Sequence, residues 1–159
     1  MKTINLIAAM FFSVALCGPA ADAGRIPLNG TMEASESYQS LPDPSLGFFG
    51  NASGTATTER LGQLLLFYDG IVDVAIAAGP GGTRLIDTNG DSIYALYWGQ
   101  GAAPDPNGDV RVVHTATIVA GTGRYADATG SFTVDRMLNI FTGATSGSIN
   151  GTIIVRDHR

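Results

Sequence analysis

Apolar and polar residues alternate in short runs along most of the 159-residue chain, and turn-forming residues separate these runs. Alternation with a period of two is typical of a β-strand, because successive side chains point to opposite faces. No longer stretch keeps the period of 3.6 that an α-helix requires. The pattern therefore predicts an all-β protein. We expect strands near Gly50–Thr58, Gly62–Ala75, Arg84–Asp87, Ser92–Trp98, Val110–Val119, Gly130–Ile140 and Ser146–Val155.

Glycine-containing turns organise these strands. Asn89-Gly90 is a strong hairpin signal because both residues tolerate positive φ, and Gly79–Gly82 also has the composition of a turn. The run Gly121–Val134 places two close glycines before a glycine that opens an alternating strand, which predicts a return into an antiparallel sheet. Short strands with short turns fit either a closed antiparallel β-barrel or a two-sheet β-sandwich. We favour the barrel, because closure removes exposed sheet edges.

The first 23 residues have the pattern of a cleaved signal peptide. Lys2 precedes a short apolar run, Leu6–Leu16, and Ala21-Asp22-Ala23 matches the small-x-small rule for cleavage. The mature chain would begin at Gly24 and be secreted or periplasmic. We expect residues 24–49 to be an irregular segment in which 32–38 can form a first strand, and residues 50–159 to form the barrel.

Composition excludes several functions. The net charge is −5, and cleavage after Ala23 removes one basic and one acidic residue, so the mature chain stays acidic. An acidic chain with scattered arginines argues against binding to nucleic acid or to an anionic membrane. The only cysteine and the only lysine lie in the leader, and the two histidines, His114 and His158, are far apart. We therefore expect no metal and no cofactor.

His114 is the first candidate for ligand contact. On the strand Val110–Val119 it shares one face with Val110, Val112, Ala116 and Ile118. If this apolar row faces the interior, His114 lies there as well. It is then either a core histidine with one hydrogen-bond partner or a residue that contacts a ligand or moves a proton.

Arg136 presents a similar question, because Phe132, Val134, Leu138 and Ile140 share its face by alternation. A buried guanidinium is costly without an anionic partner. Either a bulge near residues 136 and 137 turns the side chain outward, or it pairs inside with a carboxylate. Asp73 and Asp87 are the carboxylates we consider for that pair.

Three aromatic residues of one predicted strand, Tyr94, Tyr97 and Trp98, project to both faces of the sheet. They either pack in the core or stack against a ligand. Tyr94 and Trp98 join His114 and Arg136 as candidate ligand-binding residues, whereas no residue is assigned a catalytic role.

Three segments carry a family resemblance: Gly54–Gly62, the hairpin Asn89–Asp91 and the turn Gly121–Gly130. Together they resemble a group of secreted bacterial proteins that is similar to the allene oxide cyclase and dirigent barrels. The resemblance covers roughly Gly50 to Val155. It implies an eight-stranded barrel with a central cavity, which in the plant relatives holds an apolar or phenolic substrate, and it implies a homo-oligomer. No catalytic residue of the plant proteins can be matched to a position here.

Three functions fit these observations. The one we favour is a secreted barrel that binds a small apolar or aromatic ligand without catalysing a reaction. The alternatives are a structural or interaction module whose barrel is filled by side chains, and a cyclase-like or dirigent-like isomerase. The size of the cavity separates them, because ligand pockets have volumes of about 300 Å³ or more, whereas small barrels are often filled.

Overall fold

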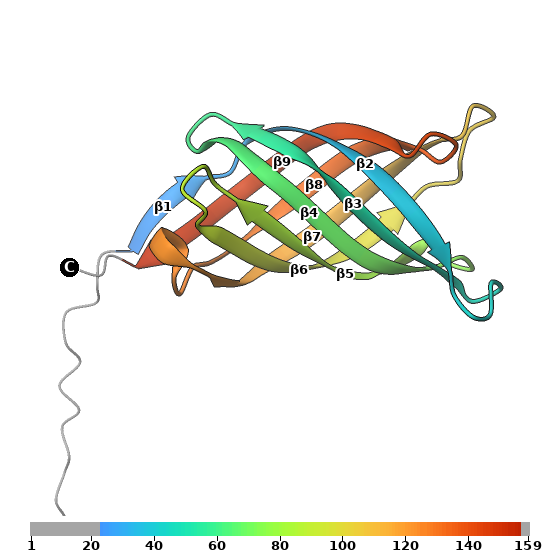
Figure 1. Cartoon of the computed structure of the whole chain (residues 1–159), viewed down its shortest axis with the longest axis horizontal. Helices are drawn as coiled ribbons and strands as arrows, with labels where there is room; N and C mark the ends of the chain where they lie inside the picture. Colours follow the sequence, from blue (N-terminus) through green and yellow to red (C-terminus); the bar gives the residue numbers. More distant parts are fainter. Residues whose placement is uncertain (1–22, 157–159) are drawn as a thin grey trace, which may run out of the picture.

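The computed structural model describes residues 23–156 and shows a closed antiparallel β-barrel (Figure 1). The only helical element of the described residues is a short 3₁₀ turn, η1 (Gly123–Tyr125). The predicted signal peptide lies outside the described residues. The strands are β1 (Ala23–Pro27), β2 (Gly30–Ser40), β3 (Gly47–Thr58), β4 (Gly62–Asp73), β5 (Ala78–Ile86), β6 (Ser92–Gly101), β7 (Asp109–Gly121), β8 (Thr129–Asn139) and β9 (Ala144–Arg156).

Eight of these strands, β2 to β9, form the barrel, and each pairs antiparallel with its neighbour along the chain. Closure comes from β9, which pairs with β8 on one side and with residues 30–35 of β2 on the other. The extra strand β1 pairs with residues 152–156 of the same edge of β9. The prediction of an antiparallel barrel is confirmed, and the sandwich alternative is not the fold that the chain adopts.

Two segments are more regular than the sequence pattern predicted. Residues 24–49 contain most of β1, all of β2 and the beginning of β3, so this segment is not irregular. Residues Gly79–Gly82 form part of β5 and not a turn. A side chain at Gly81 would overlap the ring of Tyr97 on β6, so glycine here makes room inside the barrel. The hairpin at Asn89-Gly90 is present between β5 and β6, with Gly90 at φ +88°.

The two apolar rows that we expected to face the interior, on β7 and β8, lie inside the barrel. On β7 the buried residues include Val110, His114, Ala116 and Ile118, and on β8 the row from Phe132 to Leu138 is buried. One half of the barrel is filled by a continuous apolar core. Its members include Leu28, Met32, Ala56, Leu64, Leu66, Leu85, Ile93, Ile118, Tyr125, Phe132, Ile149 and Ile153.

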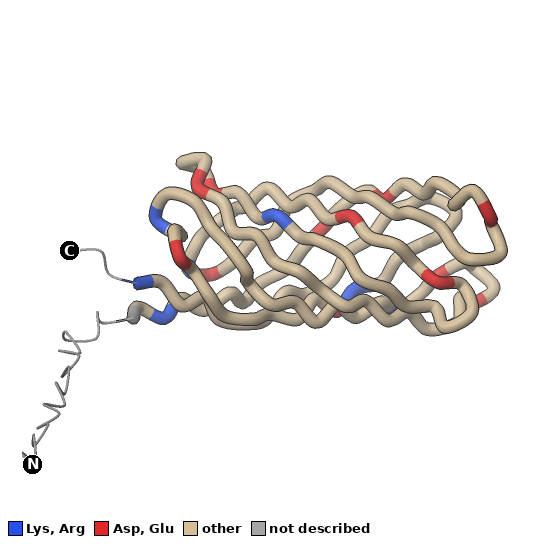
Figure 2. Tube along the Cα trace, turned by 90° about the horizontal axis from the view of Figure 1, so that it is seen from below, with Lys and Arg blue, Asp and Glu red and all other residues tan. Residues whose placement is uncertain are grey.

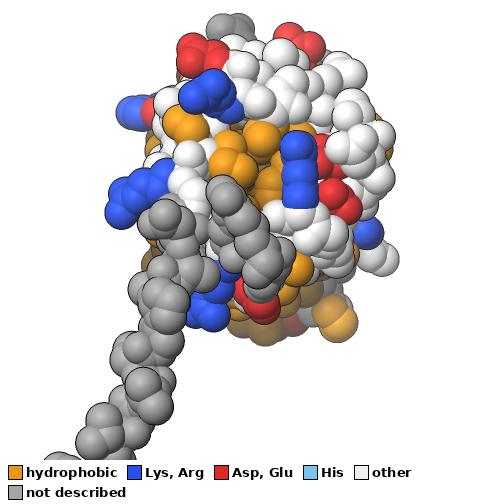
Figure 3. All heavy atoms as spheres, turned by 90° about the vertical axis from the view of Figure 1, so that its left-hand side faces the viewer, with side chains coloured by type: hydrophobic (Ala, Val, Ile, Leu, Met, Phe, Trp, Pro, Cys, Tyr) orange, Lys and Arg blue, Asp and Glu red, His pale blue; other side chains and the backbone are white. Residues whose placement is uncertain are grey.

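The end of the barrel next to the two chain termini is closed by η1. Tyr125 on this turn is only 1% exposed and belongs to the core. Gly123 begins the turn at φ +55°, a conformation that favours glycine. Arg124 reaches from η1 to the carboxylate of Asp87, with Nη2 and Oδ2 2.6 Å apart. Figure 3 views this end and shows apolar side chains at its centre with basic and acidic side chains around them.

Charged residues are unevenly distributed along the barrel (Figure 2). Most arginines lie at the end that carries the termini, where Arg25 and Arg156 lie, whereas acidic residues lie at both ends. No helix in the part of the chain that the structure describes is long and apolar enough to cross a membrane.

Candidate functional site

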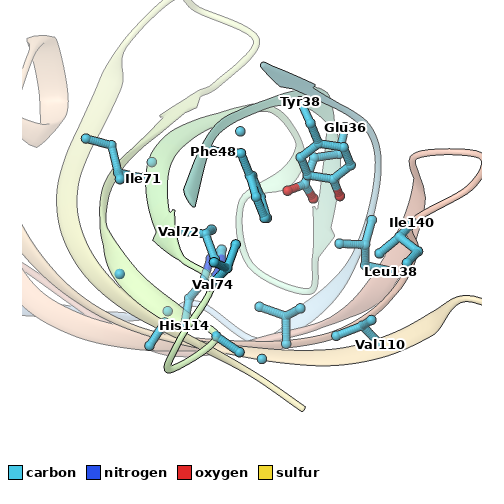
Figure 4. A pocket seen from close by; sticks show the side chains of 18 of the residues that line it. Glu36, Tyr38, Phe48, Ile71, Val72, Val74, Val110, His114, Leu138 and Ile140 are labelled. Carbon is cyan, nitrogen blue, oxygen red and sulfur yellow. The ribbon is translucent and has the colours of Figure 1, made fainter. Parts of the chain in front are cut away.

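The half of the barrel opposite the termini is hollow. It contains a cavity of about 560 Å³ that opens between the connections that join β2 to β3, β4 to β5, β6 to β7 and β8 to β9 (Figures 1 and 4). Its walls are mainly apolar. The apolar side chains around it include Phe48, Ile71, Val72, Val74, Ala77, Ala78, Ala102, Pro104, Val110, Val112, Leu138 and Ile140. This volume lies above the lower limit of about 300 Å³ for ligand pockets, so the barrel is not filled throughout.

A buried ion pair lies at the inner end of this cavity. Arg136 on β8 donates from Nη1 to Oε2 of Glu36 on β2, over 2.8 Å, and to the hydroxyl of Thr145 on β9, over 3.0 Å. The side chains of Arg136 and Glu36 are only 3% and 7% exposed. The pair therefore reaches across β9, the strand that closes the barrel. Removing either partner would leave a buried charge without compensation, at a cost of about 3–5 kcal/mol.

Two further side chains complete the polar cluster. The hydroxyl of Tyr68 on β4 donates to the same Oε2 of Glu36 over 3.0 Å, and the guanidinium of Arg136 lies 4.8 Å from the centre of the Tyr68 ring. Nε2 of His114 lies 3.4 Å from Nη2 of Arg136. A guanidinium only donates hydrogen bonds, so Nε2 accepts and the proton of a neutral His114 ring is on Nδ1. We call Glu36, Tyr68, His114 and Arg136 the polar cluster.

Tyr97 on β6 connects the polar cluster to the wall of the cavity. Its ring stacks on the His114 ring, with centroids 4.0 Å apart and planes 9° apart, and its hydroxyl donates to the carbonyl of Asp69. Glycines make this position available, because a side chain at Gly70 or Gly81 would overlap Tyr97. The ring stack therefore depends on the glycines of β4 and β5.

Burial changes the protonation of these rings. It lowers the pKa of His114 to about 3, and the nearby charge of Arg136 lowers it further in the same direction. His114 is therefore neutral near pH 7. Burial also raises the pKa of Tyr68, Tyr97 and Tyr38, and the negative charge of Glu36 adds to that effect, while Arg136 opposes it. These phenols keep their protons and can donate hydrogen bonds.

The structure brings together two of the four predicted ligand-binding residues. His114 and Arg136 both line the cavity and contact each other. Tyr94 and Trp98 lie on the opposite face of β6 and do not line it. Trp98 is 51% exposed, and the ring of Tyr94 lies 5.1 Å from the guanidinium of Arg84. Strand alternation separates them from Tyr97, which does line the cavity.

The partner of Arg136 differs from both carboxylates that we considered. No bulge turns Arg136 outward, and neither Asp73 nor Asp87 reaches it, because Asp87 pairs with Arg124 at the closed end. The partner is Glu36, one hundred residues away in the sequence. A signal for it existed: Glu36 shares the inward face of its strand with Met32 and Ala34, so it is a lone carboxylate in a mostly apolar row.

Within residues 23–156, no group of three or more His, Cys, Asp and Glu side chains is arranged to hold a metal ion. The arrangement suits other chemistry. Tyr68 and Arg136 both donate to Oε2 of Glu36, and Tyr38 also interacts with this carboxylate. A carboxylate has about four lone pairs, so Glu36 can still accept a hydrogen bond from a ligand. Figure 4 looks into the cavity and shows Glu36 beside Tyr38, with Phe48 next to them. A ligand here would meet apolar walls and one acceptor-rich point.

A small antiparallel barrel that is packed at one end and hollow at the other, with a few polar groups deep inside, defines the structural class of this protein. Among solved structures, the fold of this chain is similar to that of the pterocarpan synthase dirigent protein GePTS1. The two chains superpose with a TM-score of 0.62, covering 94% of this chain and 100% of the other, at 13% sequence identity. This likeness shows a dirigent-like barrel fold. No family model matches the sequence, and no curated protein matches it.

Proposed function

We propose that this protein binds a small, largely apolar ligand with one hydrogen-bonding group in the open half of its barrel. The observation that carries this proposal is a cavity of about 560 Å³ with apolar walls and the polar cluster at its inner end. Ligand sites commonly combine apolar walls with a few convergent polar groups. A structural barrel would gain stability from filling this space, because empty apolar volume costs packing contacts.

Aromatic rings around the cavity favour a flat ligand. Tyr38 and Phe48 meet edge to face near the opening, with centroids 5.1 Å apart, and Tyr97 forms part of the inner wall. Aromatic groups gain additional stabilisation from offset or edge-to-face contacts with such rings. The structural neighbour is named a pterocarpan synthase, and a pterocarpan is an aromatic compound, which agrees with this preference.

The polar cluster also supports a second candidate function, an isomerase or cyclase that transfers a proton within a bound substrate. Glu36 could accept a proton from the substrate, and the protonated hydroxyl of Tyr68 lies 3.0 Å from Glu36 Oε2. General acid–base catalysis requires such groups within hydrogen-bond reach of the reacting atoms. We rank this candidate second, because binding alone accounts for the cavity.

We also propose that the protein is exported and acts outside the cytoplasm. It rests on the sequence of residues 1–23, with a basic start, an apolar run and a small-x-small site. Intact-mass analysis of the exported protein should give a chain that begins at Gly24. A mature protein that retains Met1 would contradict it.

Ligand binding is tested with a small aromatic panel on the folded protein. Isothermal titration calorimetry with 2-naphthol and with naphthalene should show binding of both, and a higher affinity for 2-naphthol because its hydroxyl can donate to Glu36. His114→Leu should keep the fold and weaken 2-naphthol binding. Absence of heat and of thermal stabilisation with every member of the panel would count against a ligand site.

A further inference from the structure

Both terminal nitrogens of the Arg136 guanidinium already contact groups of the protein. Nη1 donates to Glu36 and to Thr145, and Nη2 contacts His114. Nε is buried without a partner, so a ligand in the cavity cannot reach it. A carboxylate usually binds arginine through two parallel hydrogen bonds. A ligand carboxylate could form them only by displacing Glu36 or His114.

The opening of the cavity is acidic. Asp43, Asp73, Asp105 and Asp109 lie in the connections and strand ends at this end of the barrel. Among the described residues, none of the four connecting segments 41–46, 74–77, 102–108 and 140–143 contains a basic residue. Figure 2 shows acidic residues at this end of the barrel and most of the basic residues at the other end. The nearby basic residue Arg111 is paired with Asp135, so acidic groups remain in excess around the mouth. An excess of negative charge repels anions, so an anionic ligand meets an unfavourable field before it reaches Arg136.

We propose that Glu36 determines which ligand charge the cavity accepts. By pairing with Arg136 inside the apolar cavity, Glu36 leaves the polar cluster without net charge, so that the protein binds uncharged ligands and rejects carboxylates. This inference rests on the proposed function for the existence of a natural ligand. Its test does not, because it compares charged probes on matched variants.

Removal of the Glu36 charge should reverse the selectivity. In Glu36→Gln the guanidinium of Arg136 keeps its buried position but loses its only carboxylate. A ligand carboxylate then supplies the missing partner, and its desolvation is compensated by a charge-assisted hydrogen bond. Glu36 thus acts as a built-in occupant of the place where a ligand anion would otherwise bind.

The experiment measures the affinity of 2-naphthol and 2-naphthoate at pH 7 by calorimetry. Wild-type protein should bind 2-naphthol at least about tenfold more tightly than 2-naphthoate. In Glu36→Gln this order should invert, with a gain of about tenfold or more for 2-naphthoate. Glu33→Gln is the matched control, because it removes the same charge from an exposed position of the same strand and should leave both affinities unchanged.

A second variant covers the case in which Glu36→Gln does not fold. Arg136→Gln leaves the carboxylate of Glu36 alone and should favour 2-naphthylmethylammonium over 2-naphthol. Equal affinities of wild-type protein for 2-naphthol and 2-naphthoate would overturn the inference, as would wild-type preference for the ammonium probe. If wild-type protein binds no probe, the proposed function fails. The charge inference then stands only if Glu36→Gln gains 2-naphthoate binding, and it falls if that variant gains none.

Discussion

Mild acid should destabilise this protein through His114. In the folded state the ring is buried against Tyr97 and beside Arg136, and its pKa is lowered from 6.5 to about 3. In the unfolded state the ring is hydrated and takes up a proton at its ordinary pKa. The contribution that neutral His114 makes to the unfolding free energy is therefore fully present above pH 6.5, and it is lost as the pH falls from 6.5 toward 3.

The size of the loss follows from this difference. Each pH unit below 6.5 favours the unfolded state by about 1.4 kcal/mol for one proton, so pH 5 should cost about 2 kcal/mol relative to pH 7. This is a large fraction of the about 5–15 kcal/mol that typically separates folded from unfolded domains. Asp43, Asp87 and Asp135 do not contribute strongly in this window, because their lowered pKa values make them sensitive only at more acidic pH.

Urea denaturation at pH 7 and at pH 5, followed by circular dichroism, measures this loss. Wild-type protein should lose about 2 kcal/mol of unfolding free energy, whereas His114→Leu should lose little, because leucine binds no proton. His158 is present in both proteins, so its effect cancels in the comparison. Equal losses in the two proteins would refute the reasoning and would mean that His114 takes up its proton without unfolding.

Three further predictions test the outer face, the mouth and the closed end. Trp98→Ala should leave 2-naphthol affinity unchanged, because Trp98 points away from the cavity; a change above about threefold in calorimetry would contradict the placement. Gly101→Leu should fold and reduce that affinity, because a side chain at this position enters the mouth of the cavity. Its Cβ would lie 3.3 Å from the carbonyl oxygen of Ala77, the nearest atom. Unchanged binding would place the ligand elsewhere. Arg124→Ala should cost about 1–3 kcal/mol by urea denaturation, because it leaves a buried carboxylate short of a partner. Arg111→Ala, whose 63% exposed side chain pairs with Asp135, should cost at most about 1 kcal/mol, and equal costs of the two substitutions would contradict this account.

Alternation and turn residues predicted an all-β antiparallel fold but left the closed barrel, which we favoured, and the sandwich both open. The rows of β7 and β8 could be assigned to the interior because each combines one apolar face with one polar face. The glycines of β5 wrongly indicated a turn, since glycine is common in turns and weakens isolated strands. These positions require glycine because of a residue on another strand: the ring of Tyr97 occupies the space beside Gly81. Such a requirement exists only after the barrel has formed.

The candidate site was predictable in part for a similar reason. His114 and Arg136 stood out because each interrupts an apolar row, and the structure places both at the cavity. The choice of Glu36 as the partner of Arg136 could not be made from spacing, because the pair bridges two strands that meet only through β9. Alternation puts Tyr94 and Trp98 on one face of β6 and Tyr97 on the other, and only the closed barrel shows that the Tyr97 face points into the cavity.

The position of β9 has a consequence for how the chain reaches this structure. β9 pairs with β1 and β2 at one edge and with β8 at the other. The first two described strands therefore cannot complete their pairing until the last strand is present. Until residues 144–156 are available, two strand edges stay unpaired, and open edges invite pairing with other chains. Contacts this distant in sequence also slow folding. The ring of strands should therefore close late and in a single cooperative step, after nearly the whole chain has been made.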